Sequence, residues 1–187
     1  MIEFRAAKKQ ECRIIAELFS ISSGGVADYI WSKQAEEGED IFDVGRRRYE
    51  EEDSVFSYKN CIVAEKDKQL VGMLVAFPMV CDGMVSDDPV LAPYSLLEVD
   101  NSFYICGVAI RSEYRGQGIG TQLMKLAEQQ AKLRKFEILS LIVFEENQEA
   151  LEFYKNLGYR EVKRAKIVSH PLIHADGDAI LMEKNIS

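Results

Sequence analysis

The sequence has little histidine, no cysteines at metal-binding spacing and no long hydrophobic run. Only two histidines occur among 187 residues, and no two of the four cysteines form a Cys-x-x-Cys pair, the spacing typical of zinc sites. We therefore expect reduced, mostly buried thiols, as in a cytoplasmic protein, and no metal. No apolar stretch approaches the roughly 20 residues that cross a bilayer, and we expect neither a signal peptide nor a membrane anchor.

Positive charge is also in short supply. Lysine and arginine together number 23 against 31 aspartates and glutamates, which gives a net charge of −8 and a sequence pI near 4.9. A nucleic-acid backbone attracts cationic surfaces, so we do not expect nucleic acid as the main partner. An acidic surface tolerates a cationic substrate, although most of these carboxylates are expected to form a solvated face.

The chain is 47% hydrophobic over its 187 residues, which is enough for one domain with a sizeable core. Apolar alternation predicts strands at 2–6, 60–65, 70–77, 103–110, 136–144, 159–168 and 179–182. Helical spacing predicts helices at 8–19, 26–35, 43–53, 91–97 and 148–157, with serines ending the first of them. The longest irregular segment, 78–101, is expected to be functional.

One stretch, FYICGVAIRSEYRGQGIGTQLMKL at residues 103–126, organises the rest. A buried strand is followed by a polar elbow, by three glycines and by a helix that begins near Ile119. Unpaired N–H groups and the helix dipole make such a turn an anion site, and glycine lets a phosphate approach the backbone. A Rossmann site would place this turn after the first strand, with an acidic residue about 20 positions later. Here the turn lies past mid-chain, and Glu145-Glu146 comes too late.

Two motifs resemble the signatures of the GNAT family of N-acetyltransferases. The segment RGQGIG, residues 115–120, fits the Arg/Gln-x-x-Gly-x-Gly/Ala pattern with which that family holds the pyrophosphate of acetyl-coenzyme A (acetyl-CoA). The segment NQEALEFYKNLGY, residues 147–159, resembles the second signature, whose Asn and Tyr reach coenzyme A near its reactive end. The resemblance covers the chain from about residue 60 onward.

The resemblance implies an α/β (α+β) fold in a single N-acetyltransferase domain, residues 1–187. Its mixed central sheet would have six to seven strands flanked by helices, with an acyl-CoA cleft where the central strands splay. Residues 1–59 would form a helical acceptor-side region, and residues 60–187 would form the acetyl-CoA-binding core. Tyr29 and Trp31 could then face the substrate, or they could pack in the core as most aromatic residues do.

The resemblance also implies a set of cofactor contacts. Backbone groups of Val108 and Ile110 would bind the pantetheine arm, and the Val108 N–H would polarise the thioester carbonyl, unless the strand is fully paired. Arg115 would add charge to the pyrophosphate site, Asn147 would anchor pantetheine, and Ala150 would leave room for the cofactor. The expected cofactor-binding residues are Val108, Ala109, Ile110, Arg115, Gly116, Gln117, Gly118, Ile119, Gly120, Thr121, Asn147, Ala150 and Tyr154.

Acetyl transfer to an amine needs a general acid for the leaving thiolate and a base for the amine. Tyr154 is the candidate acid, although it could also belong to the core face of its helix. The base is open. Tyr104 occupies the position of a glutamate in histone-type members; some relatives pair a tyrosine there with a histidine on the next strand, where this chain has Ile142. Glu98 and Asp100, just before the strand, could act through a water chain, with Tyr104 as a relay.

The two histidines have a suitable pKa for a base, but they lie in the 169–178 linker, where surface residues are common. The expected activity is transfer of an acetyl group from acetyl-CoA to a primary amine, which could belong to a small polyamine-like or antibiotic amine, a peptide N-terminus or a protein lysine. One alternative is an acyl-CoA-binding or sensing module without turnover, and another is a nucleotide-dependent enzyme. Oligomeric state is left open, a homodimer being one expectation.

Overall fold

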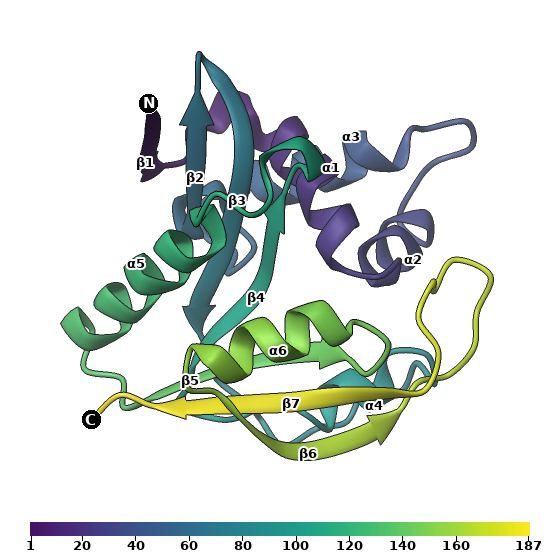
Figure 1. Ribbon diagram of the computed structural model, residues 1–187. Helices are drawn as coiled ribbons and strands as arrows, with labels where there is room; N and C mark the ends of the chain where they lie inside the picture. Colours follow the sequence, from purple (N-terminus) through teal and green to yellow (C-terminus); the bar gives the residue numbers. More distant parts are fainter. The chain divides into compact units, whose positions relative to one another are not determined.

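The computed structural model describes residues 1–187, and its strands form a seven-stranded sheet in the order β1-β2-β3-β4-β5-β7-β6 (Figure 1). The β4–β5 pair is parallel, whereas the β1–β2, β2–β3, β5–β7 and β6–β7 pairs are antiparallel. This confirms the predicted mixed sheet. The strands are β1 Ile2–Ala6, β2 Cys61–Lys66, β3 Gln69–Pro78, β4 Phe103–Ile110, β5 Ile138–Phe144, β6 Arg160–Lys166 and β7 Asp178–Asn185.

Six α-helices accompany the sheet, and none of them is long and apolar enough to cross a membrane. Short 3₁₀ turns stand at Lys9–Glu11, Tyr58–Asn60 and Ser112–Tyr114. The helices are α1 Cys12–Ser22, α2 Val26–Ser32, α3 Ile41–Glu50, α4 Ala92–Ser95, α5 Ile119–Leu133 and α6 Gln148–Asn156.

The chain divides into two compact units, each built from two segments. Unit 1 comprises Met1–Ala76 and Gly107–Ala127, and unit 2 comprises Phe77–Cys106 and Glu128–Ser187. The elements β3, β4 and α5 each begin in one unit and end in the other.

In unit 1, β2 and β3 form a hairpin, as the short polar stretch 67–69 between two apolar runs predicts. Asp67 and Lys68 at its turn have φ of 51° and 64°, the left-handed pair that a tight two-residue hairpin turn requires. The sequence predicts a bulge or a close neighbour at Gly72, and both occur. The β2–β3 register shifts beside Ala64, the partner of Gly72. A Cβ on Gly72 would lie 3.1 Å from the carbonyl oxygen of Ala109.

Helix α1 buries an apolar face against its own unit. The ring of Phe19 lies 6.3 Å from the ring of Trp31 and 6.0 Å from that of Tyr49. Trp31 is 1% exposed and Tyr29 is 8% exposed, so of the two expectations for these aromatics the structure supports core packing. The buried residues of α1 are Cys12, Ile15, Ala16, Leu18 and Phe19.

The prediction that serines end this helix is wrong, because α1 continues through Ser20 to Ser22. The Ser22 hydroxyl donates to the Phe19 carbonyl at 2.9 Å, and the Ser20 hydroxyl donates to Asp28 at 2.6 Å. A serine that bonds a carbonyl of the preceding turn can remain within a helix.

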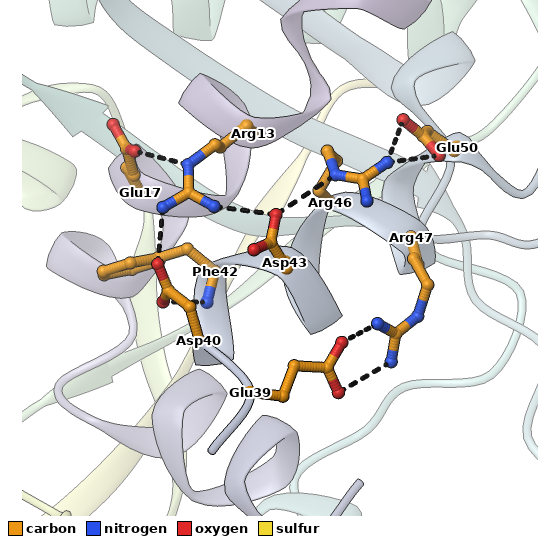
Figure 2. A network of polar contacts seen from close by, with 9 residues as sticks. All are labelled: Arg13, Glu17, Glu39, Asp40, Phe42, Asp43, Arg46, Arg47 and Glu50. Atoms are coloured by element: carbon orange, nitrogen blue, oxygen red, sulfur yellow. Dashed lines mark hydrogen bonds and ion pairs between the residues drawn. The ribbon is translucent and has the colours of Figure 1, made fainter. Parts of the chain in front are cut away.

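Helix α3 begins earlier than predicted and carries a network of ion pairs (Figure 2). Asp40 is the N-cap, with its carboxylate accepting the N–H two residues on at 2.9 Å. Three arginines at 46–48 followed by three glutamates at 50–52 predict ion pairs along the helix, and one occurs between Arg46 and Glu50 at 2.9 Å. Arg13 of α1 reaches Asp40 at 2.5 Å, a contact that the sequence does not predict. These exposed pairs contribute little individually, but together they tie α1 to α3.

Other predicted boundaries move by a few residues. The helix predicted at 26–35 ends at Ser32, and the strand predicted at 136–144 begins at Ile138. Phe136 instead packs its ring 5.6 Å from that of Phe103. The last strand extends to Asp178–Asn185, and the segment 78–101 contains only the short α4.

In unit 2, β7 lies between β5 and β6, and its residues 179–182 are buried. β6 is an edge strand with mostly exposed, charged side chains, a composition that discourages pairing with another chain. Beside the start of β4, Ser102 and Ser140 are both fully buried, and their hydroxyl oxygens are 2.6 Å apart. Ser102 also donates to the Val99 carbonyl at 2.8 Å, so Ser140 is the donor in the shared hydrogen bond.

We predict that Ser102→Ala lowers the free energy of unfolding by about 1 to 3 kcal/mol, because the buried Ser140 hydroxyl loses its partner. Urea denaturation measures this change. Ser102→Ala combined with Ser140→Ala should cost less than the sum of the two single variants. Strictly additive losses would show that the two hydroxyls do not interact.

Candidate functional site

The glycine turn before α5 is open to solvent. Gly116 and Gly118 have φ of 72° and 78°, a conformation that side chains rarely adopt. No atom lies within 4 Å of a Cβ built on either glycine. The two glycines, together with Arg115 and Gln117, are exposed, whereas Ile119 is 2% exposed and anchors the start of α5. The turn therefore leaves an uncovered backbone surface.

Backbone donors are available on this surface. The first helical bond of α5 runs from the Gln122 N–H to the Gly118 carbonyl at 3.1 Å. The N–H groups from Gly116 through Thr121 donate to no backbone carbonyl. Unpaired donors at the positive end of a helix favour a bound anion. Residues 116–121 therefore fit a phosphate group in both space and charge.

Arg115 lies beside the end of β4. Its Nε donates to the Ile110 carbonyl at 3.3 Å, and the exposed side chain keeps other N–H groups for an anion. The Gln117 amide donates back to the Glu113 carbonyl at 3.4 Å, which braces the turn. The structure thus brings the predicted arginine, the glycine turn and the strand end together within unit 1.

The hydrogen-bonding directions of β4 can be assigned from its end. The Arg111 N–H donates to the Val71 carbonyl of β3 at 2.9 Å. Because backbone groups alternate in direction along a strand, the N–H groups of Val108 and Ile110 point away from β3. The described β4–β5 pairing runs only from Phe103 to Ile105.

The second predicted motif forms α6 and its cap. An asparagine just before a predicted helix indicates an N-cap, and the Asn147 side-chain oxygen does accept the Ala150 N–H at 3.1 Å. The amide group of Asn147 is exposed and retains its N–H donors, because capping uses only the oxygen. Ala150 is half-buried, and Gly158 closes the helix with φ of 91°.

Tyr154 combines a packed ring with a hydroxyl that has no hydrogen bond within the chain. Its ring lies 5.3 Å from that of Phe153 and 5.9 Å from that of Tyr159. Burial raises the pKa of Tyr154 to about 12. The phenol is therefore protonated at physiological pH and can donate. The ring of Tyr154 packs as a residue on the core face of the helix would. Its hydroxyl is still available to donate a hydrogen bond.

Tyr104 packs its ring 5.7 Å from the ring of Phe77 in an edge-to-face contact. Burial raises the pKa of Tyr104 well above its usual value, and nearby Cys106, Glu98 and Tyr154 raise it further. A phenol held neutral in this way is a weak base, although it can still relay a proton or position a ligand.

Glu98 and Asp100 differ in their surroundings. Partial burial, followed by the charge of Asp82, raises the pKa of Glu98, and the Cys81 sulfur lies 4.0 Å from its carboxylate. Asp100 accepts the Cys81 N–H at 2.9 Å, so one of its oxygens supports the loop. The raised pKa of Glu98 lies closer to the range of a useful base than the ordinary value of a glutamate does.

Ile142 has no ionisable group, and the two remaining candidate bases are the histidines of the 169–178 linker. Ile142 packs against the apolar cluster that contains Leu97 and Ile167. The His170 ring accepts the Leu172 N–H at 3.2 Å and so stabilises a turn, while His174 is exposed.

One residue beside the site escaped the sequence analysis. A Cβ on Gly107 would lie 2.8 Å from a ring carbon of Phe19 and 2.8 Å from the Ser22 hydroxyl. The sequence did contain a sign of this contact. A glycine inside an otherwise β-favouring run often marks a place where another part of the chain approaches the strand backbone closely.

Comparison with known proteins agrees with the two motifs. The chain matches the model of the acetyltransferase (GNAT) family over residues 27–159. An uncharacterized N-acetyltransferase of Methanocaldococcus jannaschii is 42% identical over 59 residues, which are 32% of this chain and 26% of that protein. The thialysine N-epsilon-acetyltransferase of Sus scrofa is 32% identical over 65 residues, which are 35% of this chain and 38% of that protein. The chain thus spans less than two fifths of either curated relative.

A similar fold occurs in the NatC complex bound to Gag peptide and CoA. The TM-score is 0.62 at 18% identity, over 100% of this chain and 99% of that chain. At this identity the likeness concerns the fold alone. The family model, in contrast, covers well over half of the sequence, and the chain therefore belongs to the acetyltransferase (GNAT) family.

Proposed function

We propose that the protein is an N-acetyltransferase that moves an acetyl group from acetyl-CoA to a primary amine. The observation that carries this proposal is the row of unpartnered N–H groups at residues 116–121, in a turn where two glycines leave open space. The adjoining strand adds the N–H groups of Val108 and Ile110, which point away from β3. Acetyl-CoA carries a diphosphate followed by an amide-bearing arm, and these groups could accept hydrogen bonds from this row of N–H donors.

In the proposed mechanism unit 1 holds the donor substrate. The turn residues Gly116 through Thr121 bind the pyrophosphate through their N–H groups, and Arg115 adds positive charge. Backbone groups from Val108 to Ile110 bind the pantetheine arm. The Val108 N–H donates to the thioester oxygen as negative charge develops there. Backbone donors do not depend on the side chain, so apolar residues are compatible with this role.

Proton transfer is assigned to residues of unit 2. Glu98 accepts the proton of the amine, directly or through water, with Tyr104 as a relay that remains protonated. The amine nitrogen attacks the thioester carbonyl carbon and the carbon–sulfur bond breaks. Tyr154 then donates its proton to the leaving thiolate. Asn147 anchors the pantetheine through its amide N–H groups, and the small Ala150 leaves room for the cofactor.

We further propose that residues 1–187 act as one domain, with residues 1–59 on the acceptor side. Each unit is assembled from two chain segments, and three elements run through both, so neither unit corresponds to a contiguous piece of sequence. A net charge of −8 suits a cationic acceptor. The porcine relative's name specifies an epsilon amine, which supports a primary amine as the acceptor class.

The pyrophosphate site is tested by Gly118→Asp. A carboxylate there adds bulk and like charge where the diphosphate would bind. In a thermal-shift titration, the parent should gain about 2.7 kcal/mol of stability at CoA a hundredfold above its dissociation constant, and the variant should gain none. Gly38→Asp is the matched control, because Gly38 also has φ of 78° and open surroundings. If the Gly118→Asp protein binds CoA as tightly as the control does, this turn is not the pyrophosphate site.

The acid role is tested by Tyr154→Phe, which keeps the ring and removes the donor. We expect the single-turnover rate of acetyl transfer to fall about 10²-fold, with CoA affinity and melting temperature almost unchanged. Single-turnover measurement prevents product release from masking the chemical step. Tyr154→Ala should additionally lower the free energy of unfolding by about 3 to 5 kcal/mol. An unchanged rate in the Phe variant would leave Tyr154 as a cofactor-lining residue.

A parent that binds CoA but shows no turnover would favour the sensing module.

The base is tested by the pH dependence of Glu98→Gln. A carboxylate works as a base only when it is deprotonated, so the parent rate should fall as pH drops through the raised pKa of Glu98. The Gln variant should lose this acid-side inflection and about 10²-fold of the plateau rate. Asp87→Asn, at an exposed site in the same loop, serves as the control. If the acid-side inflection persists in Glu98→Gln, another residue is the general base.

A further inference from the structure

Helix α1 packs directly on the backbone of β4 at Gly107. A Cβ at this position would meet two ring carbons of Phe19 at 2.8 and 2.9 Å and the Ser22 hydroxyl at 2.8 Å. Separations under 3.0 Å cannot be accommodated without movement. The helix therefore lies as close to the strand as a residue without a side chain permits.

The requirement for glycine at this position is steric. Gly107 is absent from the glycines with positive φ, so an alanine would suffer no backbone strain there. The contact itself is what excludes a side chain.

The helix side of this contact is held firmly. The Phe19 ring is wedged between those of Trp31 and Tyr49, and both of these residues are at most 1% exposed. The Ser22 hydroxyl is fixed by its bond to the Phe19 carbonyl at 2.9 Å. A side chain added at residue 107 would therefore push on β4 more readily than on α1, because close-packed cores resist displacement.

The strand side leads to the group that carries the proposed chemistry. Gly107 is bonded directly to Val108, whose N–H points away from β3. We propose that Gly107 is a positioning residue: its missing side chain lets α1 rest on β4 and so sets where the Val108 N–H stands. This inference rests on the proposed function. A displacement of about 1 Å at a reacting group can cost 10²-fold in rate.

Gly107→Ala tests the proposal, with Gly45→Ala as the matched control. A Cβ on Gly45 would meet Ala16 at 2.8 Å and Trp31 at 2.9 Å, an equal overlap in the same unit where α1 meets α3. Both variants should melt at lower temperature. Only Gly107→Ala should also lose at least tenfold in single-turnover acetyl transfer, with CoA affinity within threefold of the parent. The proposal is overturned if Gly107→Ala transfers acetyl groups as fast as Gly45→Ala does, including the case in which both variants lose rate equally.

Second-site changes extend the test. In the Gly107→Ala background, Phe19→Leu with Ser22→Ala removes the overlapping atoms and should restore part of the lost rate. If Gly107→Ala does not fold, Ser22→Thr adds a methyl group at the same contact from the helix side and should slow transfer without weakening CoA binding; an unchanged rate there rejects the proposal. A parent that binds CoA but transfers no acetyl group rejects the proposed function itself, whereas an active parent with an unaffected Gly107→Ala rejects only the role of Gly107.

Discussion

The anchoring of β4 to β3 is the interaction on which the candidate site depends. Arg111 makes this attachment twice, through its N–H to the Val71 carbonyl and through its side chain to the Leu70 carbonyl, both at 2.9 Å. Backbone groups alternate along a strand, so fixing one edge determines which donors face the other. The N–H groups of Val108 and Ile110 are thereby left for another partner. Unsatisfied backbone donors are costly when buried, and the open glycine turn next to them continues the same row of donors at the surface.

A site built from backbone donors places few demands on side chains. Charge and bulk must be kept out of the turn, which is why Gly116 and Gly118 matter, and why the surrounding residues can be apolar. The candidate proton-transfer groups, Glu98, Tyr104 and Tyr154, all belong to unit 2. In the proposed mechanism, anion binding and proton transfer thus fall to different parts of the chain, so a substitution that removes one should leave the other.

Local patterns predicted the parts of this molecule that local interactions determine. The limits of β4, the Asn147 cap of α6 and the Asp67-Lys68 turn follow from strand propensity, capping and hairpin geometry. The end of α1 did not follow, because Ser20 and Ser22 find partners that a helix-breaking rule ignores. The ion pair from Arg13 and the close contact at Gly107 join residues far apart in sequence. No periodicity in one segment specifies such contacts.

Burial also bears on the proposed acid and base, of which the sequence named Tyr154 as the acid and left the base open. Tyr104 and Tyr154 are both tyrosines, and the pKa of each is raised because desolvation penalises the phenolate. Neither can take a proton at physiological pH, whereas each can give or relay one. Desolvation shifts the carboxyl pKa of Glu98 upward as well, but for an acid with a low starting value this moves it toward the useful range of a base. The same physical effect therefore suits Tyr154 on α6 to the proposed role of acid and Glu98 before β4 to the proposed role of base.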